Sequence, residues 1–263
     1  MHLHMHKNVL CIYTCIKLEM LFILQYTTYK QGGKRMFLSF SYKPYIVIIG
    51  DIINSKELEH RNEVQERLRR TLQDINERYN ADIAASFMIT LGDEFQGLLH
   101  NGKNTMKIIE ELRSSMYPVR IRFGIGIGEV FTKIDQVETR EIDGPCYYSA
   151  RSAIDYLKKS EKRYHSDEAD TRIEIEEDAS DCASLMNTVF SLMSVIEKNW
   201  TERQRAIIYD YALHQDGQEK CAARLEIAQS SVQRGLTNGN YYAYAQALNT
   251  INHILGEIQK NDI

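Results

Sequence analysis

Residues Ile89–Leu98 combine two short apolar runs with a tight turn between them. Gly92 and Asp93 stand at the turn, and Glu94 follows directly. Two apolar runs joined by a pair that contains Gly are typical of a β-hairpin, because Gly reaches the backbone angles of two-residue turns. The sequence therefore predicts a hairpin over residues 84–99 that carries two carboxylates at its tip.

A further carboxylate follows the apolar run 45–50, which predicts a buried strand that ends at Asp51. Mg²⁺ prefers oxygen ligands, and acidic residues at the ends of neighbouring strands suit metal-assisted phosphoryl transfer. Asp51 and Asp93 are therefore candidate ligands of Mg²⁺ or Mn²⁺. In the alternative interpretation Asp51 caps the following turn. Glu94 is either another ligand or an outward-facing hairpin residue.

Periodic apolar positions place the other elements of residues 45–178. Helices are expected over 60–79, 104–115 and 144–159, and strands over 45–50, 84–99, 119–128 and 171–176. This order predicts an α+β fold: a ferredoxin-like, palm-like sheet with helices on one face. Gly124, Gly126 and Gly128 alternate with apolar residues inside a strand, so we expect a ligand or another backbone to approach them closely.

The pattern becomes wholly helical from about residue 179, which predicts a second, all-α domain over 179–263. Thr201 is expected to cap a helix that runs to about residue 213. Two short helices over 218–225 and 229–237 predict a helix-turn-helix, and a last helix is expected over 241–258. Trp200, directly before Thr201, is expected to form a hydrophobic staple, and the tyrosines near residue 241 are expected to pack between helices.

The first 44 residues differ from the rest. They carry a net charge of +5 in a chain of −4, so residues 45–263 carry −9. Gln31-Gly32-Gly33 can be encoded by a sequence that contains a bacterial ribosome-binding site, and Met36 follows shortly after. We expect translation to start at Met36, so that residues 1–35 are a wrongly extended reading frame within a mis-translated or disordered leader of residues 1–44. A genuine basic tail is the alternative.

Composition limits the location of the protein. The five cysteines are scattered, without the spacing of a zinc site, which is typical of a reducing compartment. The leader is too charged to span a membrane and has no signal-cleavage site. We expect a cytoplasmic protein that does not bind a membrane. An acidic body disfavours nonspecific binding to nucleic acids and is compatible with Mg²⁺-nucleotides.

Several segments resemble the SatD family of bacterial proteins. They are residues 45–56, 90–99, 122–128, 143–154 and 229–244. A wider resemblance is to class III nucleotide cyclases, and Gly92-Asp93-Glu94-Phe95 also resembles the signature of GGDEF diguanylate cyclases. These resemblances imply a palm-like domain that binds a nucleotide triphosphate or a signalling nucleotide with a divalent cation.

The cyclase resemblance implies individual roles. Asp51, Asp93 and Arg151 would be catalytic, with Arg151 on the transition-state phosphates. Asp51, the Ile52 carbonyl, Asp93 and Glu94 would hold metal. The backbone of Ile53, Asn54, Ser55 and Lys56 would cradle the phosphates. From the sequence alone, Arg151 could equally pair with Asp155, one helical turn further along.

Two positions depart from the cyclase pattern. Ile89 stands where class III cyclases have a base-reading Lys, and Tyr147 stands where they have an Asn that aligns the ribose. Cyclase activity itself is therefore not expected to survive, because a phenol does not reproduce the geometry of an amide. The triphosphate and metal positions are retained.

The C-terminal helices resemble the helix-turn-helix of sigma-factor region 4. That resemblance implies DNA contact through Ser230, Ser231, Gln233 and Arg234, with a homodimer reading two half-sites. Glu226 stands where those modules usually have Gly, so it must accept a positive φ or reshape the turn. Residues 200–263 carry a net charge of −1, whereas DNA-binding modules are usually basic.

Three hypotheses of function follow. The first is a cytosolic regulator with a nucleotide- and metal-binding palm-like domain and a DNA-binding helix-turn-helix. The second is an active Mg²⁺-dependent nucleotidyl cyclase or transferase whose C-terminal helices serve in docking or dimerisation. The third is a scaffold with neither activity. The retained acidic pair favours the first two, and the lost Lys and Asn favour the first over the second.

Overall fold

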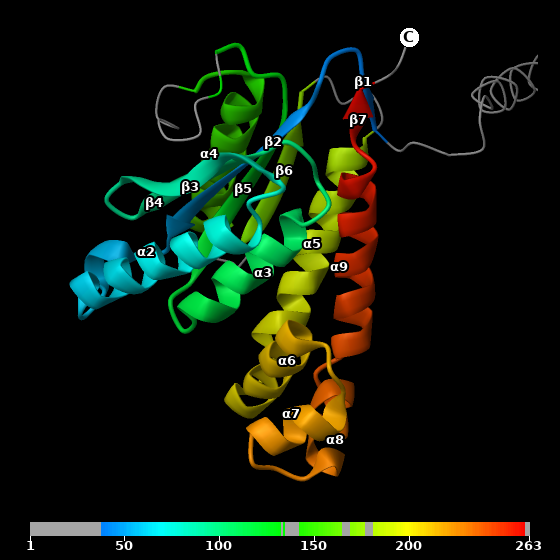
Figure 1. Ribbon diagram of the computed structural model, residues 1–263. Helices are drawn as coiled ribbons and strands as arrows, with labels where there is room; N and C mark the ends of the chain where they lie inside the picture. The colour runs from blue at the N-terminus through cyan, green and yellow to red at the C-terminus, as the bar shows by residue number, and fades with distance from the viewer. Residues whose placement is uncertain (1–37, 133, 135–141, 165–168, 177–180, 261–263) are drawn as a thin grey trace, which may run out of the picture. The chain divides into compact units, whose positions relative to one another are not determined.

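The computed structural model describes residues 38–132, 134, 142–164, 169–176 and 181–260 (Figure 1). Five strands form one mixed sheet in the order β3-β4-β2-β5-β6. Their bounds are β2 Tyr45–Ile52, β3 Ile83–Leu91, β4 Glu94–Leu99, β5 Ile121–Gly128 and β6 Thr171–Ile175. β2 lies in the centre and is antiparallel to both β4 and β5, whereas β5 and β6 are parallel. The predicted α+β sheet is confirmed.

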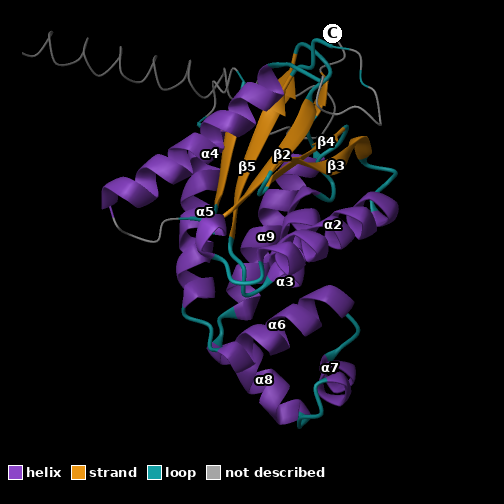
Figure 2. Ribbon diagram, turned by 90° about the vertical axis from the view of Figure 1, so that its left-hand side faces the viewer, coloured by secondary structure: helices purple, strands orange, loops and turns teal. Residues whose placement is uncertain are grey.

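Helices cover both faces of this sheet (Figure 2). On one face, α2 (Arg61–Arg78) and α3 (Thr105–Met116) pack against Ile46 and Ile48 of β2. On the other face, α4 (Pro145–Tyr164) covers Val47 and Ile49. The prediction of helices on one face is therefore wrong. Each helix has one apolar stripe, but β2 is apolar on both sides, so periodicity does not say which face a helix covers.

Glycines on β5 let α4 lie directly on the sheet. A Cβ on Gly124 would come within 2.4 Å of the Ala150 carbonyl oxygen, and one on Gly126 within 2.0 Å of the Cys146 oxygen. Both contacts are far shorter than van der Waals distance. The expected close approach of another backbone is confirmed, and that backbone belongs to α4.

The C-terminal part of the chain, from Cys182 to Gly256, is helical, as expected. It consists of α5 Cys182–Lys198, α6 Glu202–His214, α7 Gln218–Arg224, α8 Gln229–Asn238 and α9 Tyr241–Gly256. Thr201 caps α6 in a capping box with Gln204, as its position predicts. α5 contacts β6, and α9 contacts both α3 and α5. These two helices therefore cover the same side of the sheet as α2 and α3.

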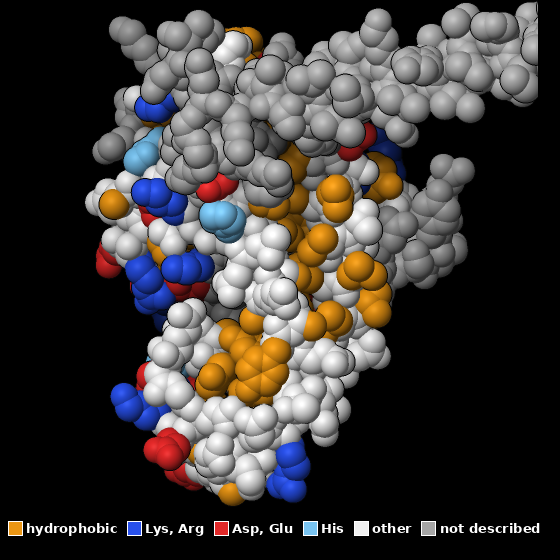
Figure 3. All heavy atoms as spheres, turned by 90° about the vertical axis from the view of Figure 1, so that its right-hand side faces the viewer, with side chains coloured by type: hydrophobic (Ala, Val, Ile, Leu, Met, Phe, Trp, Pro, Cys, Tyr) orange, Lys and Arg blue, Asp and Glu red, His pale blue; other side chains and the backbone are white. Residues whose placement is uncertain are grey.

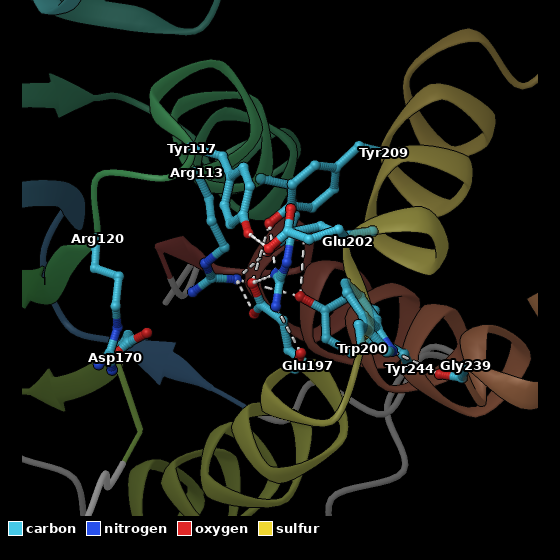
Figure 4. Close-up of polar contacts among 12 residues, drawn as sticks. Arg113, Tyr117, Arg120, Asp170, Glu197, Trp200, Glu202, Tyr209, Gly239 and Tyr244 are labelled. Carbon is cyan, nitrogen blue, oxygen red and sulfur yellow. Dashed lines mark hydrogen bonds and ion pairs between the residues drawn. The ribbon is translucent and has the colours of Figure 1, made fainter. Parts of the chain in front are cut away.

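A polar network joins the C-terminal helices to the sheet side of the molecule (Figure 4). Arg113 of α3 pairs with Glu110 at 2.5 Å and with Glu197 of α5 at 3.6 Å. Arg205 of α6 pairs with the same Glu197 at 2.9 Å. Burial disfavours the charge of Arg113, but the two carboxylates outweigh it and raise its pKa. The guanidinium is therefore held in its charged form between the helices.

Residues Phe37–Ile263 form one compact unit. The hydrophobic core runs without a break from Ile48 of the sheet to Phe190 of α5 and Leu255 of α9. The boundary expected near residue 179 stays a prediction about separate folding. Of the expected leader, residues 1–37 lie outside the described residues. Leu38 and Phe40 are buried, and β1 (Ser39–Phe40) pairs with β7 (Gln259–Lys260).

None of the helices in the described part of the chain combines the length and the hydrophobicity that a membrane crossing requires.

Candidate functional site

The hairpin of β3 and β4 forms as the sequence predicts. Leu91 pairs with Glu94 in the ladder, so Gly92 and Asp93 alone make the turn. Gly92 has a φ of +61°, at the first turn position, where two-residue hairpins commonly require Gly. Gln65 of α2 donates a hydrogen bond to the Gly92 carbonyl at 2.8 Å. The turn is thus fixed from outside as well as by its own backbone.

Asp93 is tied to the segment that follows β2. Its backbone carbonyl accepts a hydrogen bond from the Ile52 N–H at 3.2 Å, and its carboxylate accepts one from the Ser55 hydroxyl. The structure therefore brings the end of β2 and the hairpin turn side by side, as the metal hypothesis requires. The Ile52 carbonyl and the Asp51 carboxylate belong to this same end of the sheet.

Asp51 lies directly opposite Glu94 in the β2–β4 ladder and opposite Arg122 in the β2–β5 ladder. Opposed residues of neighbouring strands point to the same face of a sheet. That face is the one covered by α4, which supplies Lys158 and Arg151. Five charged side chains therefore meet at one end of the sheet, beneath one helix.

Asp51 is 6% exposed and is held by two cations. Its Oδ2 accepts a hydrogen bond from Arg122 Nη1 at 2.9 Å, and its Oδ1 lies 2.6 Å from Lys158 Nζ. Arg122 also pairs with Glu161 of α4. Since both carboxylate oxygens are engaged and Asp51 is a buried strand residue, the turn-capping alternative does not describe its main contacts.

Glu94 is 9% exposed and pairs with Arg151, whose Nη1 lies 2.6 Å from both carboxylate oxygens. The contact joins residues 57 positions apart, so the partner of Arg151 is Glu94 and not Asp155, and Glu94 was not among the expected partners. Glu94 likewise points inward and is not an outward-facing hairpin residue. The Arg151 side chain is itself 47% exposed, so a bound molecule could reach it.

In the segment expected to cradle phosphates, one backbone N–H already has a hydrogen-bond partner, and others lie at the start of a short helix. The Ile53 N–H already donates to the Arg120 carbonyl at 2.9 Å. Asn54 adopts a left-handed conformation and precedes the short helix η1 (Ser55–Glu57). The first N–H groups of a helix have no partner within it, so those of Ser55 and Lys56 are oriented away from the helix body.

The candidate ligands are of the chemical type that Mg²⁺ prefers. Asp51, Asp93 and the Ile52 carbonyl are all oxygen donors, but no three acidic, His or Cys side chains gather around one point within the described ranges. Mg²⁺ is usually bound through one or two carboxylates, with phosphate and water completing its shell. These residues therefore fit a cation that arrives with a phosphate better than a permanently resident one.

Ile89 and Tyr147, the two residues that depart from the cyclase pattern, contribute to the packing of the protein. Ile89 packs against the hydrophobic core. Tyr147 is 8% exposed in the core beneath α4, where its hydroxyl has no hydrogen-bond partner among the described residues, and burial raises its pKa. Neither side chain is therefore placed to read a base or align a ribose.

Arg122, Lys158 and Glu161 belong to the site but were not predicted from the sequence. The positions of Lys158 and Glu161 could have indicated their role. Lys158 lies seven residues after Arg151, and Glu161 lies three residues further on, so all three share one face of α4. Arg122 gave no such signal, because strand alternation alone does not show which neighbour a side chain meets.

The helix-turn-helix residues lie far along the chain from this site, on α8. Ser230, Gln233 and Arg234 are exposed, and Ser231 is half-buried. Glu226 has a φ of +55°, so it accepts the positive angle that the turn demands. Arg224 of α7 is neutralised by Asp210 and Asp216 at 2.8 and 2.7 Å. No comparison identifies this part as a sigma-like module.

Comparison with solved structures finds proteins of low similarity. An adenylate cyclase from Trypanosoma brucei is 15% identical, with a TM-score of 0.34, over 44% of this chain and 69% of that one. A bacterial light-regulated adenylyl cyclase is 13% identical, with a TM-score of 0.34, over 49% and 74%. A regulator of polyketide synthase expression from Bifidobacterium adolescentis is 11% identical, with a TM-score of 0.27, over 81% and 85%.

No curated protein matches the sequence. The model of the SatD family matches residues 45–255, which include every strand of the five-stranded sheet, all the charged residues of the candidate site, and helices α5 to α9. Because the match extends over most of the chain, this protein belongs to the SatD family.

Proposed function

We propose that this protein binds the polyphosphate of a nucleotide together with Mg²⁺ or Mn²⁺ beneath α4, at the edge of the sheet where β2 ends and β4 and β5 begin. One observation carries the proposal: the ladder sets Asp51 opposite both Glu94 and Arg122, and α4 brings Arg151 and Lys158 to the same place. The basic residues of this edge can bind phosphate oxygens, and the carboxylates beside them can bind the metal ion that accompanies the phosphates.

Each partner has a role in this proposal. Asp51, Asp93 and the Ile52 carbonyl would hold the cation, which when bound would neutralise phosphate charge. Lys158 and Arg151 are 39% and 47% exposed, so they can turn from their carboxylates toward phosphate oxygens. Arg122 is only 11% exposed and would remain as the fixed partner of Asp51.

Thermal unfolding of the whole protein with ATP or GTP, each with and without Mg²⁺, tests the proposal. A ligand at a hundredfold excess over its Kd stabilises the folded state by about 2.7 kcal/mol. The stabilisation should need both nucleotide and metal, and it should be lost in Asp51→Asn and Asp93→Asn. Asp155→Asn, at an exposed position of α4, is the matched control. Equal stabilisation in all three variants would contradict the proposal.

The same experiment separates sensor from enzyme. If the site only senses the nucleotide, the nucleotide is recovered unchanged after incubation. Loss of the base-reading and ribose-aligning side chains supports this outcome, because Ile89 packs against the core and Tyr147 lies in it. A cyclic or linear dinucleotide product that disappears in Arg151→Ala would instead establish a nucleotidyl cyclase or transferase.

A second function is DNA binding by α8, as part of a regulator. Its support is the exposed polar face formed by Ser230, Gln233 and Arg234, next to a turn in which Glu226 has the required positive φ. If Arg234 reads a base edge, Arg234→Ala should weaken binding to a specific site by about 1–3 kcal/mol. Genome-wide binding at physiological salt, with and without nucleotide, is the measurement. Absence of any enriched site removes this function.

A further inference from the structure

A groove of about 490 Å³ lies between α3, α6 and α9, away from the residues of the nucleotide site. Its volume is in the range of small-molecule sites. Six of the residues that line it are tyrosines: Tyr79, Tyr209, Tyr211, Tyr241, Tyr242 and Tyr244. The face of the molecule in Figure 3 carries a band of hydrophobic side chains, with most charged ones along one margin.

The tyrosines present ring faces at steep angles to one another. Tyr211 and Tyr241 have centroids 5.5 Å apart and planes inclined at 88°, and Tyr241 and Tyr242 are 5.7 Å apart at 65°. In each pair the edge of one ring meets the face of the other, so the faces of the edge-on ring stay outside the contact. The negative face of an aromatic ring attracts a cation within about 6 Å, and cages of aromatic rings recognise alkylammonium groups.

Two carboxylates face the same groove from α3. Glu110 accepts a hydrogen bond from the Tyr244 hydroxyl at 2.9 Å, and Glu111 accepts one from the Tyr79 hydroxyl at 3.1 Å. Their basic partners, Arg113 and Arg78, are not among the described residues that line the groove. Burial raises the pKa of Glu110, Arg113 opposes this effect and Glu197 adds to it. A cation in the groove would add to the compensation that Arg113 gives.

The less exposed charged residues of the lining are Glu110 and Glu111, and each also pairs with an arginine outside the lining. Lys107 is the only basic residue among the described residues that line the groove, and it is exposed. Glu110 and Glu111 are 22% and 11% exposed. We infer that this groove binds a small organic cation, an alkylammonium group on an apolar body, between the tyrosine rings and the α3 carboxylates.

Choline and its neutral carbon analogue, 3,3-dimethylbutan-1-ol, test this on the whole protein. The two have nearly the same shape and differ in charge. We expect choline to bind at least about tenfold more tightly in isothermal titration calorimetry, a difference of about 1.4 kcal/mol. Equal affinities, or no binding of choline, would overturn the inference and leave an apolar groove without charge selectivity.

Variants locate the binding. Tyr242 is 50% exposed, so Tyr242→Leu removes a ring with little effect on the core. It should weaken choline binding several-fold, whereas Tyr242→Phe keeps the ring and should bind as the parent does. Glu111→Gln should also weaken choline but not the neutral analogue. Asp51→Asn should leave choline affinity unchanged, which separates this site from the nucleotide site. Binding that survives both Tyr242→Leu and Glu111→Gln unchanged would contradict the inference.

Discussion

At the scale of single residues, the candidate site is a chain of ion pairs whose members differ in exposure. Asp51 and Arg122 have side chains 8% and 11% exposed, while Lys158 and Arg151 are about four times more open. Water screens an exposed pair but hardly a buried one. The Asp51–Arg122 pair is therefore a fixed part of the fold, and the two helical cations are the ones able to change partners.

Arg122→Met should destabilise the protein by about 3 kcal/mol, because loss of one partner leaves a buried charge incompletely neutralised. Adding Asp51→Asn to Arg122→Met removes that charge and should recover part of the loss. Urea unfolding at pH 7 measures both. Arg69→Met, at an exposed α2 pair with a side chain 66% exposed, is the control and should cost less than about 1 kcal/mol. A similar loss of unfolding free energy in Arg122→Met and Arg69→Met would show that burial of the Asp51–Arg122 pair does not strengthen it.

A buried thiol gives a second prediction at this scale. Burial raises the pKa of Cys146 to about 12, from an ordinary value of 9.0. A raised folded-state pKa means that its stabilising effect is complete below pH 9 and is lost as pH rises toward 12. One such group lowers the free energy of unfolding by about 1.4 kcal/mol per pH unit within that window. Urea midpoints between pH 7 and 11 should fall less steeply in Cys146→Ala, and an unchanged slope would contradict the assignment.

At the scale of elements, the contact between α4 and β5 sets the position of the site. Gly124 and Gly126 let the α4 backbone touch the sheet. Arg151 and Lys158 then reach Glu94 and Asp51 from the helix above. A helix held further from the sheet would carry both cations away from their carboxylates. The glycine stripe therefore serves the site although none of its residues takes part in it.

Gly126→Ala should destabilise the protein by about 2 kcal/mol or more, since its Cβ would meet the Cys146 carbonyl oxygen at 2.0 Å. Gly256→Ala is the matched control. A Cβ there would be 3.7 Å from its nearest neighbour, Lys103, which is ordinary contact, and Ala favours the helix. That variant should be neutral or slightly stabilising. Thermal unfolding compares the two, and equal effects would show that the close approach is not limiting.

At the scale of the whole molecule, the C-terminal helices are part of the core that supports the sheet. Phe190 and Met193 of α5 and Leu255 of α9 are at most 4% exposed and belong to the same cluster as Ile48. The network of Arg113, Glu197 and Arg205 spans the same boundary. Separating the C-terminal helices from the sheet would expose both apolar surface and buried charge. We therefore expect the sheet and the C-terminal helices to unfold together.

Trp200 offers a direct measurement, because it is the only tryptophan and lies at the start of the α6 region. Its fluorescence in urea should change at the same concentration as hydrogen exchange of the β2 amides, in one transition. Phe190→Ala should shift both signals equally, by about 3–5 kcal/mol. Two separate transitions would instead support an independent C-terminal domain beginning near residue 179.

Much of this architecture was predictable because it depends on neighbours along the chain. Apolar periodicity predicts β5, α2 and α3 to within two residues at each end, whereas α4 extends five residues past its predicted end. Gly92 predicts the two-residue turn, and Thr201 predicts the start of α6. For Glu226 the sequence left two alternatives, a positive φ or a reshaped turn, and the structure shows the positive φ. These are local properties, fixed by a few consecutive residues.

Only the tertiary structure decided which residues far apart in the sequence contact one another. Arg151 could reach Asp155 along its own helix, but the fold pairs it with Glu94, 57 residues away. β2 is apolar on both faces, so only packing assigned α4 to one face and α2 and α3 to the other. The tyrosines near residue 241 were expected to pack between helices, yet three helices leave a groove among them. Sequence patterns determine which surfaces of an element are apolar or charged, whereas close packing of the whole chain determines which of those surfaces meet.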